Sequence, residues 1–166
     1  MTTNQEGAPI RSLAPGDRAG IERIVRSTGN FSEAEVAVAL ELVDAALARG
    51  DESGYFFSII AEGEAVRGYA CYGQTPMTIG TWDLYWIAVE KSCQGKGYGR
   101  RLLRDAEEDV RRRGGRLLLI ETSSQESYGG TRRFYDRAGY VLAATIPGFY
   151  KPGDDKLVFL KYLRGE

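Results

Sequence analysis

The stretch from Thr81 to Leu103 constrains the fold of this chain more than any other part of the sequence. It opens with an apolar and aromatic segment, Thr81–Val89, of the length and composition typical of a buried strand. A short turn and the glycine-rich segment Gln94–Gly99 follow, and an amphipathic helical pattern begins at about Gly97. Backbone N–H groups converge in such a loop and at the start of the helix, and both features bind anions. The stretch therefore predicts a site for a phosphate-bearing ligand.

Three cations, Lys96, Arg100 and Arg101, lie at the predicted N-terminus of this helix. The positive end of the helix dipole disfavours cations, so a bound anion would offset the cost of placing them there. In the alternative interpretation the segment is a solvated basic turn, and its glycines serve only as turn residues. The strand before the loop and the helix after it favour the phosphate site.

The spacing of the glycines selects among the known phosphate-binding loops. Lys96 is not followed by the Ser or Thr that a Walker loop requires, and the glycines do not match the dinucleotide fingerprint. The segment does match Gln-x-x-Gly-x-Gly, from Gln94 to Gly99, and so resembles the pyrophosphate-binding motif of the GNAT superfamily of acetyl-CoA-dependent N-acetyltransferases. This resemblance implies that the loop holds the pyrophosphate of coenzyme A, while the strand before it pairs with the pantetheine arm.

The resemblance also implies which residues of the strand and the loop bind the coenzyme. A backbone N–H near Ile87 is expected to polarise the thioester carbonyl. An intact strand that continues through Val89 is the alternative. The expected coenzyme-binding residues here are Ile87, Ala88, Val89, Gln94, Gly95, Lys96, Gly97, Tyr98, Gly99 and Arg100.

The composition argues against several classes of protein. The chain has 166 residues, enough for one domain, and 43% of them are hydrophobic, enough for a core. A net charge of −1 argues against a nucleic-acid-binding protein, and no apolar segment reaches the length of a membrane span. The lack of histidine and the two cysteines, Cys71 and Cys93, argue against a metal site or a disulfide framework. We expect a cytoplasmic enzyme that uses no metal.

The order of the predicted elements also matches that of the GNAT superfamily, and the resemblance extends from Ile10 to Leu163. It implies an α/β (α+β) fold, the GNAT acyltransferase fold, with a mixed central sheet of about six to seven strands and about four flanking helices. The sheet is expected to splay between the fourth and fifth strands. We expect a single domain over residues 1–166, with a flexible N-terminus at 1–9. Strands are predicted at 10–13, 55–62, 65–72, 81–89, 117–122, 140–146 and 157–163, and helices at 17–29, 32–50, 97–113 and 128–138.

The general acid is expected on the last predicted helix. The segment Phe134–Tyr140 resembles the Tyr-x-x-x-Gly-Phe/Tyr signature of the family, in which the tyrosine hydroxyl protonates the departing thiolate. This match assigns the acid role to Tyr135, and a core tyrosine with a bonded hydroxyl is the alternative. Many members of the family carry Asn seven residues earlier, where this chain has Tyr128. Tyr128, Ser124 or Arg132 is expected to replace that contact with the coenzyme.

No histidine is present to act as the general base, so a carboxylate is expected in that role. Asp83 lies on the strand before the loop, at the position that corresponds to the base glutamate of histone-type acetyltransferases. Its aromatic neighbours, Trp82, Tyr85 and Trp86, would raise its pKa and make it a better base. Because aspartate is short, a water between it and the amine is one alternative. Glu121 on the next predicted strand is the second candidate, and simple binding of the amine by Asp83 is the third.

An aromatic and partly acidic group of residues is expected to bind the acceptor. Such a lining suits a small cationic amine, for example an amino acid or a related metabolite. Phe31, between the first two helices, either joins this lining or packs under its loop. The segment Phe149–Asp155 either lines the pocket, contacts a second subunit or forms a plain turn. The expected acceptor-binding residues are Tyr85, Glu121, Ser123, Phe31 and Tyr150.

The sequence leaves rival functions open. A non-catalytic acyl-CoA-binding regulatory module would keep Gln94–Gly99 but would not need both Tyr135 and Asp83. An acetyltransferase that acts on a protein lysine or N-terminus is another alternative, as is an acyltransferase with a longer acyl group. The bulk of Tyr85 and Trp86 favours acetyl over longer groups. A homodimer is expected from the resemblance alone.

Overall fold

The computed structural model describes residues 7–164, so residues 1–6 of the predicted flexible N-terminus lie outside the described part of the chain. The chain forms two compact units. Unit 1 comprises the residues up to Cys71 together with Trp86–Ala106. Unit 2 comprises Tyr72–Tyr85 together with the residues from Glu107 onward. The single domain expected from the sequence stays a prediction.

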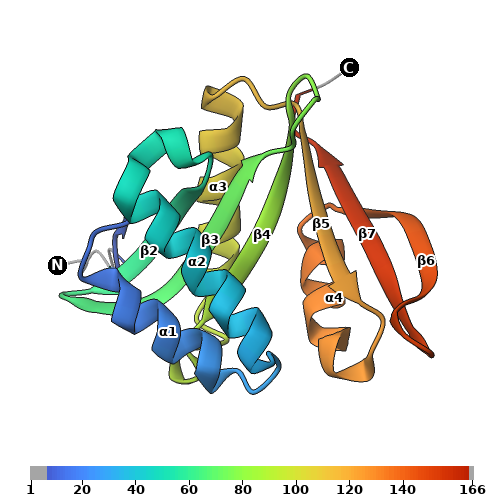
Figure 1. The fold of residues 1–166 in the computed structure, drawn as a ribbon, viewed down its shortest axis with the longest axis horizontal. Coiled ribbons are helices and arrows are strands. Elements are labelled where there is room, and N and C mark those ends of the chain that lie inside the picture. Colours follow the sequence, from blue (N-terminus) through green and yellow to red (C-terminus); the bar gives the residue numbers. More distant parts are fainter. Residues whose placement is uncertain (1–6, 165–166) are drawn as a thin grey trace, which may run out of the picture. The chain divides into compact units, whose positions relative to one another are not determined.

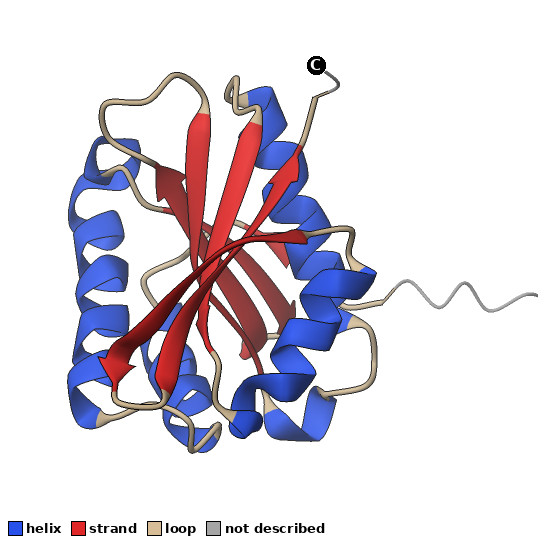
Figure 2. Ribbon diagram, turned by 90° about the vertical axis from the view of Figure 1, so that its right-hand side faces the viewer, coloured by secondary structure: helices blue, strands red, loops and turns tan. Residues whose placement is uncertain are grey.

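Seven strands and four α-helices form in the described residues. The strands are β1 (Ile10–Arg11), β2 (Phe56–Glu62), β3 (Ala65–Gln74), β4 (Thr81–Val89), β5 (Leu117–Ser123), β6 (Val141–Lys151) and β7 (Asp154–Tyr162). The helices are α1 (Asp17–Ser27), α2 (Glu33–Arg49), α3 (Tyr98–Arg112) and α4 (Gly129–Arg137). Figure 1 labels these elements, and Figure 2 shows the strong twist of the strands.

The sheet is mixed, and its strand order is β1-β2-β3-β4-β5-β7-β6. This confirms the predicted mixed sheet of seven strands with four helices. β4 and β5 run parallel, and their ladder joins Thr81–Leu84 to Leu117–Ile120. Because β4 continues to Val89, this short ladder matches the predicted splay between the fourth and fifth strands.

In unit 1, α1 and α2 lie side by side against β2 and β3 (Figure 1). A capping box begins α2, since the Ser32 hydroxyl accepts from the Glu35 N–H and the Glu35 carboxylate accepts from the Ser32 N–H. Asp17 is the first residue of α1, and its carboxylate accepts from the Ala14 N–H and from Arg11. The apolar residues of the unit's core include Ile21, Ile24, Val25, Val36, Leu40, Val43, Phe57 and Ile59.

In unit 2, β7 lies between β5 and β6 and is antiparallel to both. Ser123 of β5 pairs with Lys156 of β7, so these two side chains and that of Glu121 share one face of the sheet. Phe159 lies on the opposite face. The ring of Tyr135 lies 6.1 Å from the ring of Phe159, so α4 covers this second face.

The structure corrects the prediction for the segment before the last strand. Residues 147–155 are predicted to form a loop, but β6 continues through Pro147 to Lys151, and β7 already begins at Asp154. The ladder of these strands shifts register between Ile146 and Lys151. Proline is tolerated because β6 is an edge strand, where a missing N–H costs no ladder bond. The Asp155 carboxylate accepts a hydrogen bond of 2.8 Å from the Gly148 N–H and fixes the end of the hairpin.

The cysteines Cys71 and Cys93 are both buried and unbridged. Over residues 7–164, no three His, Cys, Asp or Glu side chains are grouped so that they could hold a metal ion. No helix in that range has both the length and the apolar composition needed to cross a membrane.

Candidate active site

The predicted pyrophosphate loop lies in unit 1, between the end of β4 and the start of α3. Gly95 and Gly97 have φ angles of +78° and +80°, which L side chains rarely adopt. No atom lies within 4 Å of a Cβ built on either residue, so the space beside the loop is open. The two glycines therefore permit the turn and also leave room for a ligand to approach the backbone.

The loop and the first turn of α3 present backbone donors that have no acceptor within the described residues. The first N–H of this helix with a partner is that of Arg101, which donates to the Gly97 carbonyl at 3.1 Å. Unbonded N–H groups at a helix N-terminus bind phosphate oxygens, so the backbone fits a pyrophosphate. The donors without an acceptor are the N–H groups of Gly95, Gly97, Tyr98, Gly99 and Arg100.

The cations of the loop differ in the hydrogen bonds and ion pairs that they form within the chain. Lys96 and Arg100 are exposed, and the Arg100 guanidinium makes no ion pair with any described residue. Arg101 instead donates to the Ala8 carbonyl at 2.6 Å. The Tyr98 hydroxyl donates to a carboxylate, that of Glu62, at 2.6 Å, and this bond raises the pKa of the tyrosine. Lys96 and Arg100 are thus the side chains left to pair with an anion at the loop.

The end of β4 is held from two sides within unit 1. The Gln94 side-chain amide donates to the Val89 carbonyl at 3.4 Å, which ties the loop back to the strand. The Glu90 N–H donates to the Arg67 carbonyl at 2.7 Å, and the two side chains form an ion pair of 2.5 Å. Ala88 is buried, whereas Ile87 and Val89 are half-buried. The backbone predicted to meet the pantetheine arm is therefore anchored on β3.

In unit 2 the predicted base, Asp83, is half-buried on β4. Its carboxylate accepts a hydrogen bond of 2.5 Å from the Thr75 hydroxyl. Burial raises the pKa of Asp83, the Thr75 bond opposes this, the charge of Glu121 raises the pKa further, and Lys156 lowers it. The charge of Glu121 therefore acts on Asp83, the other carboxylate proposed from the sequence as a base.

Glu121 is engaged by a lysine that sequence reasoning missed. The Lys156 Nζ lies 2.7 Å from the Glu121 carboxylate and 4.3 Å from the centre of the Phe149 ring. The rings of Phe149 and Tyr150 meet edge to face, with their centres 5.0 Å apart. Lys156 is also the register partner of Ser123. One expected acceptor residue, Glu121, therefore contacts an ammonium group that the chain itself supplies.

Ser123 and Arg132, expected to bind the acceptor and the coenzyme, hold the connection between β5 and α4. The Ser123 hydroxyl and the Gln125 amide donate to the buried Asp154 carboxylate at 2.5 and 2.6 Å, and they lower its pKa. The Arg132 guanidinium donates to the carbonyls of Ser123 and Gln125 at 3.0 and 2.8 Å. Tyr128 is half-buried directly before α4. Contacts of Arg132 and Tyr128 with the coenzyme stay predictions.

The expected general acid, Tyr135, is buried on α4. Its ring lies 5.9 Å from that of Tyr140, whose own hydroxyl donates to Glu107 at 3.0 Å. No hydrogen bond of the Tyr135 hydroxyl exists within the described residues. Burial raises the pKa of Tyr135. A phenol that holds its proton and is not committed to another acceptor is suited to donate that proton.

The remaining aromatic residues predicted for the acceptor site lie in different units. Phe31 and Trp86 meet edge to face in unit 1, with ring centres 4.9 Å apart, and both pack against its core. This is the packing contact that the sequence left open as an alternative for Phe31. Tyr85 belongs to unit 2 and is 38% exposed.

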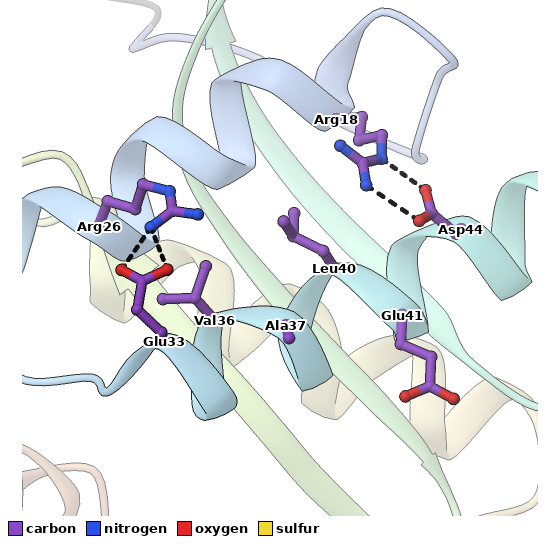
Figure 3. A pocket seen from close by; sticks show the side chains of 8 residues that line it. All are labelled: Arg18, Arg26, Glu33, Val36, Ala37, Leu40, Glu41 and Asp44. Carbon is purple, nitrogen blue, oxygen red and sulfur yellow. Dashed lines mark hydrogen bonds and ion pairs between the residues drawn. The ribbon is translucent and has the colours of Figure 1, made fainter.

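A hollow of about 380 Å³ lies between α1 and α2, apart from the loop (Figure 3). Its two arginines are both engaged, because Arg18 pairs with Asp44 at 2.6 Å and Arg26 pairs with Glu33 at 2.7 Å. The figure shows both pairs bridging the two helices. With its cations neutralised in this way, the hollow is unsuited to an anionic ligand.

Comparisons with known proteins agree on one family. The model of the acetyltransferase (GNAT) family matches residues 21–140. The crystal structure of a GNAT-family protein from Desulfovibrio desulfuricans is 46% identical, covers 95% of this chain and 100% of that chain, and has a TM-score of 0.93. No curated protein matches the chain.

Two more distant structures share the fold and were solved with the coenzyme. An aminoglycoside 6'-N-acetyltransferase complexed with coenzyme A is 16% identical, with a TM-score of 0.77 and coverage of 95% of this chain and 98% of that one. A Salmonella typhimurium protein with acetyl-CoA is 21% identical, with a TM-score of 0.77 and coverage of 97% and 96%.

Proposed function

Because the chain belongs to the GNAT acetyltransferase family, we propose that it moves the acetyl group of acetyl-CoA directly to the primary amine of a small, amino-acid-like metabolite. It is an acyltransferase, and acetyl-CoA is its acetyl donor. The observation that carries the proposal is the set of backbone N–H groups of the loop and the first turn of α3 that have no acceptor within residues 7–164, beside two glycines with open space around them. One GNAT domain over residues 1–166 is part of the proposal.

The loop is proposed to bind the pyrophosphate through these N–H groups, with Lys96 and Arg100 pairing with its charge. The backbone of Ile87–Val89 is proposed to pair with the pantetheine arm in the manner of an added strand. Gln94 supports this backbone through its bond to Val89. Tyr128 and Arg132 are proposed to complete the coenzyme site.

The chemistry needs a base for the amine and an acid for the leaving thiolate. We assign the base to Asp83, because its carboxylate is half-buried, has a raised pKa and is oriented by Thr75. We assign the acid to Tyr135, because it is buried, its pKa is raised and its hydroxyl has no acceptor in the described part of the chain. The thioester supplies the activated acetyl group, so no covalent enzyme intermediate is required.

The acceptor amine is proposed to bind among four residues of unit 2, Tyr85, Glu121, Ser123 and Tyr150. A carboxylate with aromatic neighbours attracts an ammonium ion, which is the form of a primary amine at neutral pH. Glu121 is the charged member of this set and lies at the surface of unit 2. These contacts favour a small cationic amine over a neutral acceptor.

Self-association is proposed as well, through the edge strand β6. All of its residues are exposed, and it carries no charge from Val141 to Tyr150. A long, uncharged, apolar edge strand is a template for pairing with a second chain. Covering its five large side chains would bury on the order of 500 Å² per copy, a large part of the roughly 800 Å² that a standard interface needs. These side chains are Val141, Leu142, Ile146, Phe149 and Tyr150.

A cytoplasmic location fits the two unbridged cysteines.

The proposal is tested by single-turnover release of thiol from acetyl-CoA, with amino acids, polyamines and short peptides as acceptors. We expect release with at least one small amine, and a loss of about 100-fold in its rate in Tyr135→Phe. Tyr140→Phe is the matched control, because it removes a neighbouring hydroxyl that is bonded to Glu107. Release only with peptides would assign the acceptor to a protein. Binding of acetyl-CoA without release to any amine would favour a regulatory module.

A further inference from the structure

The surroundings of Lys156 are those of a bound organic ammonium ion. Its Nζ lies 2.7 Å from the Glu121 carboxylate and 4.3 Å from the centre of the Phe149 ring. A carboxylate and an aromatic face are the two groups that proteins use to bind such cations. The side chain of Lys156 is only 15% exposed, so the ammonium is largely withdrawn from water.

These surroundings coincide with the proposed acceptor site. Glu121 contacts the ammonium directly, Ser123 is the register partner of Lys156, and Tyr150 packs against Phe149. Asp83, the proposed base, is close enough for Lys156 to lower its pKa. The amine of Lys156 thus occupies the place in which an acceptor amine is proposed to bind.

We propose that Lys156 is a modification site, whose ε-amine accepts the acetyl group of an acetyl-CoA molecule bound to the same chain. This inference rests on the proposed function, because it uses the same donor, base and acid. The low exposure of Lys156 favours transfer within one molecule over transfer from a second copy.

The reaction balances without any further reactant. The ammonium of Lys156 loses a proton to a neighbouring carboxylate, and its nitrogen forms a bond to the acetyl carbon while the C–S bond of the thioester breaks. The thiolate takes up one proton and leaves as the free thiol of coenzyme A. The ammonium gives up two protons in all, one of which ends on the thiol and the other in solvent.

Acetylation would change the charge of the acceptor site. An acetylated Lys156 is neutral and no longer pairs with Glu121, so Glu121 and Asp83 are left without their nearest cation. A site of two carboxylates and two aromatic rings attracts an external ammonium more strongly than one already filled by lysine. The modification would therefore open the site to cationic acceptors.

Lys161 provides a matched comparison on the same strand. Its Nζ also pairs with a glutamate, Glu107, at 2.9 Å, and lies 5.4 Å from the centre of the Tyr140 ring. It also donates to the Ala138 carbonyl at 2.9 Å. Lys161 thus repeats the chemistry of Lys156 but touches none of the residues proposed to bind the acceptor. Lys151, at the end of β6, is exposed, so its labelling measures the acetylation of a lysine by acetyl-CoA free in solution.

The test incubates the purified protein with acetyl-CoA that carries a deuterated acetyl group, and peptide mass spectrometry follows each lysine. We expect Lys156 to be labelled about tenfold faster than Lys151 and Lys161, with a rate constant that does not change when the protein is diluted. Asp83→Asn, which removes the proposed base, is expected to slow the labelling by about 100-fold. Lys156→Arg keeps the cation and is expected to abolish the label at that position.

Three results would overturn the inference. The first is labelling that follows exposure, with Lys151 ahead of Lys156, and the second is a rate constant that rises with protein concentration. The third is an unlabelled Lys156 in a protein that releases thiol with an external amine, in which case the proposed function stands without this inference. If acetyl-CoA does not raise the melting temperature of the protein and releases no thiol with any amine, the proposed function fails as well.

Discussion

The hydroxyl of Thr75 donates a 2.5 Å hydrogen bond to the carboxylate of Asp83, and so joins the start of the loop after β3 to the proposed base. The bond favours the charged carboxylate and works against burial, which favours the protonated form. Glu121 adds to the effect of burial, whereas Lys156 opposes it. The protonation of Asp83 is therefore set by three identifiable neighbours.

The rate of acetyl transfer should fall on the acid side at a higher pH than an ordinary aspartate would give. The base must be deprotonated, and burial raises the pKa of Asp83, so activity is lost as the pH falls through that raised value. Thr75→Val removes a hydrogen bond that lowers the pKa of Asp83, and should move the acid limb of the pH–rate profile to higher pH. Glu121→Gln removes a charge that raises the pKa of Asp83, and should move the acid limb to lower pH. Single-turnover thiol release across pH measures both shifts.

Asp83→Asn serves as the reference for these profiles. We expect its rate to drop by about 100-fold and its acid limb to disappear. An acid limb at the same pH in the wild type, Thr75→Val and Glu121→Gln would show that a group other than Asp83 is the base.

Coenzyme affinity should depend on Arg100 more than on the arginine one turn later. Arg100 lies at the start of α3 without an ion pair in the described residues, so Arg100→Gln should weaken the binding of coenzyme A by about tenfold. Arg104→Gln changes the net charge equally but lies beyond the first turn, and should have little effect. Isothermal titration at low and high salt measures both, and equal losses would contradict a specific site at the loop.

Self-association should be sensitive to a charge on β6. Ile146→Asp places a carboxylate on the apolar edge strand and should convert a dimer into a monomer, as light scattering coupled to gel filtration would detect. Val38→Asp is the matched control, because Val38 is similarly exposed but lies on α2. A monomeric wild type, or the same loss of dimer in both variants, would refute association through β6.

Two tyrosines of β3 should respond to the same substitution in opposite directions. Tyr69 is fully buried and its hydroxyl has no partner in the described part of the chain, whereas the Tyr72 hydroxyl donates to Asp109 at 2.9 Å. Tyr69→Phe removes an unsatisfied polar group and should raise the free energy of unfolding by about 1 kcal/mol. Tyr72→Phe breaks a bond and should lower it by about 1 kcal/mol. Urea denaturation measures both, and a destabilised Tyr69→Phe would imply a bound partner such as an internal water.

The sequence predicted the GNAT fold because its elements are marked by local signals. Hydrophobic periodicity marked the helices, and glycine spacing marked the loop. β6 was predicted too short because Pro147 normally ends a strand, and its tolerance depends on an edge position that only the assembled sheet defines.

The residues of the proposed site also divide into those that local sequence signals mark and those whose contacts depend on the assembled sheet. Asp83, Glu121 and Tyr135 were found from motifs and strand positions, whereas Lys156 and Thr75 were missed. The ion pair of Lys156 with Glu121 depends on the register between β5 and β7, and neither strand alone carries a signal for that register. The bond from Thr75 depends on the path of the connection before β4, which no periodic pattern describes.

Neither compact unit is a continuous piece of the chain, because β3, β4 and α3 each supply residues to both. The ribosome delivers Tyr72–Tyr85 before Trp86–Ala106, so unit 1 is completed only after part of unit 2 has been made. A nascent chain that ends near Cys71 lacks Trp86 and Ala88, which pack on the core of unit 1. Unit 1 is therefore fully packed only after these later residues have been synthesised. Neither unit can be exchanged between genes as a single uninterrupted segment.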